Sequence, residues 1–286
     1  MLGRTPDNLE AIKPLKDGVI ADFTATKKML KYFMDKVCQK YLFSKPRVVV
    51  GVPLGVTEVE ESAVEEAVME AGAREVFLIE EPMAVAIGAG LKVSEASGIM
   101  VVDIGGGTSE IAVISLGGIV ASTSIRIAGD ELTESIINYI KREYNILIGY
   151  STAEEVKHTI GSAYPSMTVE EMEIKGRDLQ TGLPRRISIK STEVEEAMKD
   201  VIMQIISAIK RTLESTPTEL AADIMINGIT ISGGSSLIKN LDRLIALETG
   251  IPVNLAPSPL DSVVVGASKV LENIDTLKSV LINQRK

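Results

Sequence analysis

The chain has 286 residues, of which 45% are hydrophobic and 24% charged, and its formal net charge is −9. This composition is typical of a folded soluble protein, and the length predicts one large or two medium domains. The negative charge argues against a general nucleic-acid-binding protein, which needs a basic surface, and against attraction to an anionic membrane by charge alone. No apolar run reaches the roughly 18 residues that a membrane-spanning helix requires, and no signal peptide is expected at the start.

The sequence offers few side chains for metal or nucleophilic chemistry. Cys38 is the single cysteine, so no intrachain disulfide can form and a reducing cytoplasm is expected. His158 is the single histidine, which leaves almost nothing for a His–Cys metal site or a Ser–His–Asp triad. Cys38 lies on the apolar stripe of a helix predicted at about 24–42, so we expect a buried structural thiol.

The first third of the chain alternates predicted strands and helices. Residues 47–53 are rich in valine, which indicates a strand covered on both faces. Thr57 and Glu60 form a capping-box pattern, and Gly72 is expected to end the helix that they open. A short strand follows, and then a helix with Pro82 as its first residue. This order predicts an α/β arrangement.

The next segment predicts an antiparallel meander. Strands are expected at 99–103, 110–116 and 119–127, because apolar runs alternate there with turns rich in glycine. Asp130 is predicted to cap the helix that follows.

The second half of the chain again mixes helices and strands. Thr152 is predicted to cap one helix, and Thr192 to cap a long helix that ends near Leu213. Short strands and loops are expected between these two helices. The remaining elements are a helix opened by Pro217, a strand at 229–232 that meets a Gly-rich turn and a helix, a strand at 252–255 and a helix over 261–271.

Residues 103–108, Asp-Ile-Gly-Gly-Gly-Thr, have the chemistry of an anion-binding turn. Three glycines allow successive amide N–H groups to point at one phosphate. Asp103 can hold Mg²⁺, directly or through water, and Thr108 can orient a phosphate oxygen or an attacking water. A plain Gly-rich hairpin turn explains the same residues equally well.

Two other segments have related chemistry. Residues 231–236, Ile-Ser-Gly-Gly-Ser-Ser, let the backbone approach a flat ring or a phosphate before a helix N-terminus. Glu80 and Glu81 precede Pro82, where a carboxylate can position a water for in-line attack on phosphorus. The alternatives are an ordinary strand-to-helix turn and a pair of acids favoured by a helix N-terminus.

Two common nucleotide-binding motifs do not occur in the sequence. There is no G-x-x-x-x-G-K-[ST] pattern, which excludes a Walker-type NTPase. The glycines at 105–107 lie between two predicted strands and do not open a helix, which disfavours a Rossmann dinucleotide site.

In combination, these segments resemble a known superfamily. Residues 101–108 resemble the second phosphate loop of the actin, DnaK-type chaperone and sugar-kinase superfamily, and residues 231–236 resemble its adenosine motif. Within that superfamily the resemblance is closest to the MreB family and covers essentially the whole chain. The segments that carry it are 2–6, 14–23, 77–84, 126–130 and 216–220.

The resemblance implies roles for individual residues. Glu81 would polarise the attacking water, Thr108 would assist hydrolysis, and Asp103 would be associated with Mg²⁺, through water. Glu154 and Lys157 would contact ribose and adenine. Two loops would supply backbone contacts: Gly105, Gly106 and Gly107 around the β- and γ-phosphates, and Gly233, Gly234 and Ser235 around the adenosine, where the family often has a third glycine in place of Ser235.

Leu42 and Phe43 fall where MreB proteins carry an exposed apolar loop that enters the membrane. Burial of one such side chain contributes roughly 1.5–3 kcal/mol at most, so one subunit would bind weakly and a filament with many copies would bind firmly. The alternative is that both residues end the preceding helix against the core.

The sequence departs from the family at its start. MreB proteins begin with a strand–turn–strand that carries the first phosphate loop, an Asp-x-Gly-Thr pattern, and this sequence starts after it. We therefore expect a first lobe that lacks central strands, a Mg²⁺-binding Asp and several phosphate-contacting amides. The ATP hydrolysis that the family couples to polymerisation would lose part of its machinery.

The predicted fold is α/β, a two-lobed actin-like (ribonuclease H-like) ATPase fold that is truncated at its N-terminus. Residues 1–102 and 258–286 would form the first lobe. Residues 103–257 would form the second lobe, with 152–228 as its outer subdomain. For this assignment to hold, Asp103, Gly234 and Glu81 must face the same nucleotide.

The resemblance implies a cytoskeletal protein that binds ATP and Mg²⁺ and polymerises into filaments at the inner face of the cytoplasmic membrane. These filaments would direct cell-wall synthesis and rod cell shape. The expected partners are further copies of the chain, MreB paralogues and the cell-wall elongation machinery, and no nucleic acid. Two alternatives remain: a nucleotide-free scaffold that copolymerises with a full-length paralogue, and a small-molecule kinase of the same superfamily.

Overall fold

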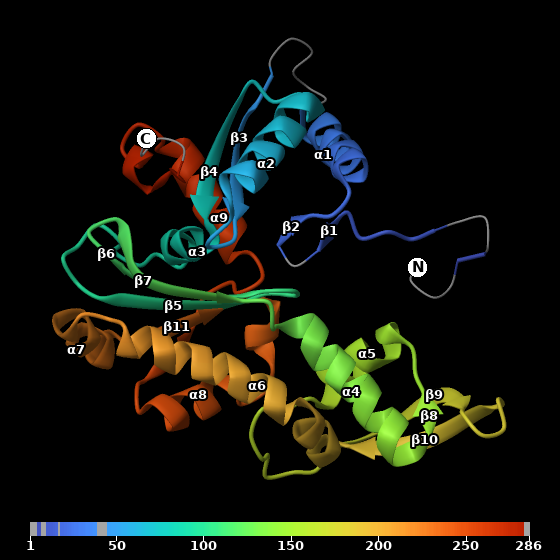
Figure 1. The fold of residues 1–286 in the computed structure, drawn as a ribbon. Coiled ribbons are helices and arrows are strands. Elements are labelled where there is room, and N and C mark those ends of the chain that lie inside the picture. Colours follow the sequence, from blue (N-terminus) through green and yellow to red (C-terminus); the bar gives the residue numbers. More distant parts are fainter. Residues whose placement is uncertain (1–4, 7–9, 17, 39–44, 283–286) are drawn as a thin grey trace.

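The computed structural model describes residues 5–6, 10–16, 18–38 and 45–282, which mix helices and strands as predicted (Figure 1). The strands are β1 (Leu15–Lys16), β2 (Val19–Ile20), β3 (Arg47–Val52), β4 (Glu75–Glu80), β5 (Ile99–Ile104), β6 (Ser109–Ser115), β7 (Gly118–Ile125), β8 (Ile146–Leu147), β9 (Glu171–Asp178), β10 (Pro184–Lys190), β11 (Ile229–Ser232) and β12 (Val253–Leu255). The helices are α1 (Phe23–Cys38), α2 (Glu58–Ala71), α3 (Glu81–Gly88), α4 (Gly129–Tyr144), α5 (Tyr150–Ile160), α6 (Ser191–Glu214), α7 (Thr218–Asn227), α8 (Leu241–Thr249) and α9 (Ser262–Glu272), with short 3₁₀ helices η1 (Gly234–Leu237) and η2 (Lys278–Val280).

The central sheet contains five strands in the order β12–β11–β5–β6–β7. The predicted meander is confirmed, because β5, β6 and β7 pair in antiparallel fashion in chain order. On its other side β5 pairs in parallel with β11, which places Ser232 opposite Asp103. The two Gly-rich turns therefore leave the same edge of the sheet, although more than a hundred residues separate them.

Helices cover both faces of the central sheet. Successive side chains of a strand point to opposite faces, so β5 and β6 contribute to two separate cores. One core lies against α4, α6 and α8, and the other against α3 and α9 (Figure 1). The first core contains Met100, Val102, Ile104, Ile111 and Val113, and the second contains Val101, Ala112 and Ile114.

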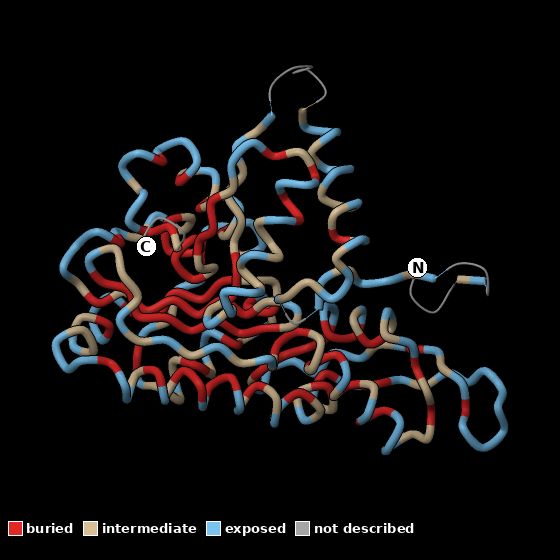
Figure 2. Tube along the Cα trace, turned by 45° about the horizontal axis from the view of Figure 1, so that its top comes forward, coloured by how far each residue is buried: buried red, intermediate tan, exposed pale blue. Residues whose placement is uncertain are grey.

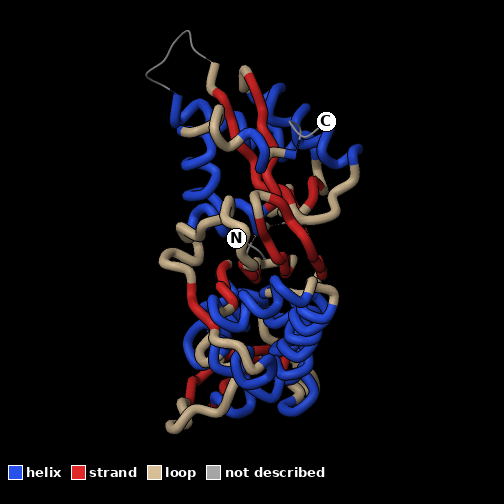
Figure 3. Tube along the Cα trace, turned by 90° about the vertical axis from the view of Figure 1, so that its left-hand side faces the viewer, coloured by secondary structure: helices blue, strands red, loops and turns tan. Residues whose placement is uncertain are grey.

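A smaller parallel sheet of β3 and β4 lies above the central sheet in Figures 1 and 3. The α9 helix packs against β3, and α2 packs against β4. The sequence predicted a strand covered on both faces at 47–53, but only Val52 of β3 is buried. Among the described residues β3 pairs with β4 alone, so its other edge has no neighbouring strand to extend the buried layer.

The α1 helix is far more exposed than its apolar stripe predicted. Phe33 and Val37 are 55% and 79% exposed, and Thr26 is the one buried residue of the helix. Figure 2 colours the chain by burial and shows that most of this helix is exposed or partly buried. The prediction of a buried Cys38 is wrong, since this residue is only partly buried. The stripe was real, but α1 packs chiefly against α2, which covers only part of it.

Helix boundaries follow the predictions where the signal is local. The capping box of Thr57 and Glu60 is present, and Gly72 ends α2 with φ of +123°. Three other predicted caps are wrong, because Asp130, Thr152 and Thr192 all lie inside their helices.

Two of these helices begin earlier because a glutamate binds the backbone ahead of the predicted cap. The carboxylate of Glu131 accepts the N–H of Ala128 at 2.8 Å, at the start of α4. In the same way, Glu193 accepts the N–H of Lys190 at 2.9 Å, at the start of α6. Within the described part of the chain, no helix combines the length and apolar character needed to cross a lipid bilayer.

Candidate functional site

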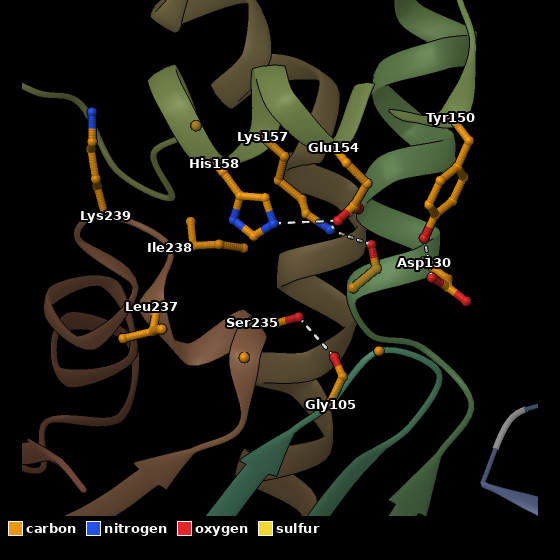
Figure 4. Close-up of a pocket in the computed structure, with 14 residues that line it drawn as sticks. Gly105, Asp130, Tyr150, Glu154, Lys157, His158, Ser235, Leu237, Ile238 and Lys239 are labelled. Atoms are coloured by element: carbon orange, nitrogen blue, oxygen red, sulfur yellow. Dashed lines mark hydrogen bonds and ion pairs between the residues drawn. The ribbon is translucent and has the colours of Figure 1, made fainter. Parts of the chain in front are cut away.

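The two Gly-rich turns meet at one edge of the central sheet. The turn after β5 and the turn after β11 lie side by side because their strands are parallel neighbours. The hydroxyl of Ser235 donates a hydrogen bond to the carbonyl oxygen of Gly105 at 2.8 Å (Figure 4). A Cβ atom on Gly233 would lie 2.7 Å from Oδ1 of Asp103, so the two turns are in close contact at a second point.

A pocket of about 240 Å³ lies where these turns face α4 and α5 (Figure 4). Four parts of the chain that are distant in sequence form its wall: the turn after β5, the start of α4, the helix α5 and the segment from η1 onward. The lining residues are Gly105, Gly106, Gly129, Asp130, Tyr150, Glu154, Lys157, His158, Gly161, Gly234, Ser235, Leu237, Ile238 and Lys239.

The pocket brings together six of the predicted site residues and leaves out five. The six are Gly105, Gly106, Glu154, Lys157, Gly234 and Ser235. The five that do not line it are Glu81, Asp103, Gly107, Thr108 and Gly233. Leu42 and Phe43 lie outside the described residues.

Glu154 and Lys157 form an ion pair on α5 in which Lys157 is buried and Glu154 is partly buried. The Nζ atom of Lys157 lies 2.5 Å from Oε1 of Glu154 and also donates to the carbonyl oxygen of Gly129 and to Oγ1 of Thr133, both at 2.8 Å. These bonds use all three N–H groups of the ammonium, so in this conformation Lys157 orients Glu154 and has no donor left for a ligand.

The carboxylate of Glu154 has partners on both oxygens. Thr133 donates to the oxygen that Lys157 binds, and Nε2 of His158 lies 3.3 Å from the other. Partial burial acts to raise the pKa of Glu154, but the hydrogen bonds from Lys157 and Thr133 outweigh burial and hold the pKa below its usual value. Glu154 is therefore an ionised acceptor at the pocket wall.

A cluster of three acids, of which Asp103 and Glu110 are buried and Glu81 is partly buried, lies beside the pocket. Asp103 on β5 faces Glu110 on β6 in the sheet register, and Glu81 begins α3. Burial, together with the negative charges of Asp103 and Glu110, raises the pKa of Glu81 to about 8. Burial and the charge of Glu110 raise the pKa of Asp103 to about 7. Burial likewise raises the pKa of Glu110.

The acid cluster is a candidate cation-binding site. Oδ1 of Asp103 is buried and, in the described part of the chain, has no hydrogen-bond partner, which is costly for a carboxylate. No group of three or more His, Cys, Asp or Glu side chains among the described residues is arranged to enclose a metal ion directly. These residues fit a hydrated divalent cation, which keeps most of its water ligands.

Thr108 closes the turn that carries the glycines. Its carbonyl oxygen accepts the N–H of Gly105 at 2.9 Å, and its side chain hydrogen-bonds to Glu110. The methyl group of Thr108 would lie 3.5 Å from a Cβ atom on Gly18, so the residue faces the β1–β2 hairpin and lies beside the acid cluster.

Several residues of the site were not predicted from the sequence. Glu110 carried a usable signal, because it is a charged residue within the otherwise apolar strand β6. Asp130 and Tyr150 carried no signal in the sequence that marks them as site residues, because they and Lys13 come from three separate segments. The carboxylate of Asp130 accepts a hydrogen bond from the hydroxyl of Tyr150 and lies 3.1 Å from Nζ of Lys13. Lys13 also lies 5.0 Å from the centre of the Tyr150 ring.

Comparisons with known proteins agree on one family. The family model described as MreB/Mbl protein matches residues 1–279. The chain is 56% identical over 276 residues to the cell shape-determining protein MreB of Escherichia coli (strain K12), which covers 96% of this chain and 80% of that protein.

Solved structures of similar fold point the same way. MreB5 of Spiroplasma citri bound to AMPPNP superposes with a TM-score of 0.91 at 38% identity, over 96% of this chain and 82% of that one. The same protein bound to ADP gives a TM-score of 0.90. The MamK double helical filament shares the fold, with a TM-score of 0.76 at 22% identity, over 91% of this chain and 80% of that one.

Proposed function

The chain belongs to the MreB/Mbl family of bacterial actin-like cytoskeletal proteins, and from this premise we propose that it binds ATP with Mg²⁺ and polymerises. The observation that carries the proposal is the convergence of the turns at Gly105–Gly106 and Gly234–Ser235 on one pocket. The MreB5 structures, which hold ADP and AMPPNP, support a nucleotide as the ligand.

In this proposal the nucleotide spans the pocket from α5 to the turn after β5. Glu154 accepts hydrogen bonds from the ribose hydroxyls, since it is an ionised acceptor held at the wall by Lys157. The glycine backbones of the two turns allow close approach of the phosphates, and the N-terminus of α4 at Gly129 adds a favourable dipole.

The acid cluster is the proposed place for Mg²⁺. Asp103 has a buried oxygen without a hydrogen-bond partner among the described residues, which a hydrated cation would satisfy through water. When bound, the ion would neutralise charge on the phosphates and favour the ionised forms of the three acids. Glu81 would then polarise the attacking water as a carboxylate, with Thr108 as its partner in hydrolysis.

The proposed assembly is a filament of two-lobed subunits. The first lobe comprises 1–102 and 258–286, and the second comprises 103–257 with 152–228 as its outer subdomain. The pocket lining belongs to the second lobe and Glu81 of the acid cluster to the first, so a nucleotide with Mg²⁺ that engages both would favour the closed arrangement of the lobes, and hydrolysis would relax it. In this way ATP turnover would control polymer growth and loss.

The proposed location of the filaments is the cytoplasmic face of the cell membrane. Leu42 and Phe43 would insert into the bilayer, each with a small contribution that the polymer multiplies. There the filaments would direct cell-wall synthesis through MreB paralogues and the elongation machinery. Co-sedimentation with lipid vesicles tests this part: replacement of both residues by Ser should abolish vesicle binding by filaments, and unchanged binding would contradict it.

Equilibrium binding of fluorescent ATP, followed by sedimentation and electron microscopy with and without ATP, tests the proposed function. A Cβ atom on Gly106 would have no atom of the described residues within 4 Å, so Gly106→Ala should fold normally and obstruct only the ligand. Gly149, which has equal space and lies outside the pocket lining, offers Gly149→Ala as the matched control. We expect the unmodified chain to form filaments only with ATP. We expect Gly106→Ala to bind ATP at least about tenfold more weakly, a difference of about 1.4 kcal/mol.

Two other outcomes would replace this proposal with one of the alternatives. Filaments that form with an MreB paralogue, without any ATP binding by this chain, would establish the nucleotide-free scaffold. Phosphoryl transfer to a sugar in a coupled assay would establish the kinase.

A further inference from the structure

The side chain of Ser235 links the two glycine-rich turns. Its hydroxyl donates to the carbonyl oxygen of Gly105 at 2.8 Å, and the residue is buried. The contact joins η1 to the turn after β5, across 130 positions of sequence (Figure 4). Each turn contributes residues to the same pocket.

The carbonyl oxygen of Gly105 accepts a second hydrogen bond, and the carbonyl of Gly106 is also held toward α4. The N–H of Gly129 donates to Gly105 at 3.2 Å, and the N–H of Asp130 donates to the carbonyl of Gly106 at 2.7 Å. In a trans peptide the C=O and the following N–H point in opposite directions. Holding both carbonyls toward α4 and η1 therefore turns the next N–H groups of the turn the other way.

Because residues 105–107 are glycines, the orientation of their peptide groups depends on the groups that hydrogen-bond to them. A glycine peptide rotates between orientations at little steric cost, so nothing within residues 105–107 holds the N–H groups toward a ligand. The space around the hydroxyl is also tight, because a Cβ atom on Gly129 would lie 2.7 Å from Oγ of Ser235. Gly129 thus leaves room for one hydroxyl between the two turns.

From these contacts we infer that Ser235 is a positioning residue that fastens the phosphate-facing turn to the adenosine-facing turn. Its hydroxyl orients the Gly105–Gly106 peptide and so strengthens binding of the phosphates, whereas the adenosine would be contacted by the backbone of the adenosine-facing turn, which Ser235→Ala keeps. This role rests on the proposed function, since the ligand is taken to be ATP. It predicts slower release of ATP and ADP than the same site would give with glycine at position 235.

The first test needs no nucleotide. Amide hydrogen exchange of the segment 104–109 is measured in the free full chain for the unmodified protein, Ser235→Ala and Ser235→Gly. Loss of one hydrogen bond should speed exchange about fivefold, on the order of 1 kcal/mol. The control is Ser236→Ala, which removes a bond of 2.7 Å to the carbonyl of Gly233 within the same turn but no link to Gly105. Unchanged exchange in both Ser235 variants overturns the inference.

The second test separates positioning from contact with the ligand and from general instability. ATP and adenosine are each titrated against the unmodified chain and Ser235→Ala. We expect about fivefold weaker binding of ATP and unchanged binding of adenosine, because only the phosphates depend on the fastened turn. Equal losses for both ligands would overturn the inference. Failure of the unmodified chain to bind ATP would refute the proposed function, whereas the exchange experiment still decides whether Ser235 fastens the turns.

Discussion

Glu110 on β6 accepts the backbone N–H of Leu54, in the loop after β3, at 3.1 Å. The other carboxylate oxygen accepts the hydroxyl of Ser124 on β7 at 2.8 Å. One buried side chain therefore ties the central sheet to the smaller β3–β4 sheet, next to the acids that are proposed to face Mg²⁺. The connection explains why a charged residue is kept within a strand that is otherwise apolar.

Removal of this tie should destabilise the protein. Glu110→Ala removes the acceptor of the Leu54 N–H and of the Ser124 and Thr108 hydroxyls. Ser124 is exposed, so water can replace the acceptor there, whereas an unsatisfied donor in the interior costs about 1–3 kcal/mol. We expect the free energy of unfolding, measured by urea denaturation, to fall by about 1–3 kcal/mol for Glu110→Ala, and by less for Glu110→Gln, which keeps one acceptor oxygen. Equal stability of Glu110→Ala and the unmodified chain would show that the tie is not formed in solution.

The acid cluster predicts that stability in the absence of divalent ions falls as the pH rises. Glu81 releases its proton near its usual value of 4.5 when unfolded but only at about 8 when folded, so the folded state holds more protons between these values. The destabilisation is absent below about 4.5 and complete above about 8. Asp103 acts in the same direction between 3.8 and about 7.

Glu81→Gln should remove much of this dependence. One group contributes at most about 1.4 kcal/mol per pH unit, so the slope of unfolding free energy against pH between 5 and 8 should become shallower by up to that amount. Urea denaturation in a chelating buffer measures it. Glu66→Gln, at an exposed position on α2, is the control and should leave the slope unchanged. A slope that Glu81→Gln does not alter would contradict the burial of this carboxyl.

The ion pair of Lys157 and Glu154 should matter more than a comparable pair at the surface. Lys157→Met keeps the apolar stem but removes one donor from Glu154 and one from the carbonyl of Gly129, and leaves Glu154 without its cationic partner on α5. Since Lys157 is 6% exposed, we expect a loss of about 1–3 kcal/mol in unfolding free energy, together with weaker ATP binding. Lys210→Met breaks a pair of 2.6 Å with Glu248 that is more exposed, and should cost less than about 1 kcal/mol. Equal losses in the two variants would argue against the buried network.

The crossing of α3 and α9 depends on two glycines. A Cβ atom on Gly266 would lie 1.9 Å from the carbonyl oxygen of Ala84, and one on Gly88 would lie 2.0 Å from that of Ser262. Backbone atoms cannot move aside cheaply, so Gly266→Ala should force the helices apart and cost about 1–3 kcal/mol or more. Thermal unfolding measures the loss, with Gly149→Ala as a control that meets open space. Wild-type stability of Gly266→Ala would mean that the helices are not this close.

The sequence alone determined the features whose causes are local. The order of strands and helices, the meander, the capping box of Thr57 and the stop at Gly72 all follow from apolar spacing and from side chains that bind nearby backbone. The glycine turns at 103–108 and 232–236 were likewise visible, because only glycine leaves the backbone open there. The family resemblance carried by these segments is confirmed by the comparisons.

Only the tertiary structure decided which of these local features meet. Strand β11 lies beside β5, so Ser232 stands opposite Asp103 and the two turns share a pocket. Pairing between distant strands depends on how the whole sheet buries its faces, and no short stretch of sequence contains that information. Burial of Glu110 and exposure of α1 have the same origin, since desolvation depends on what packs against each side chain.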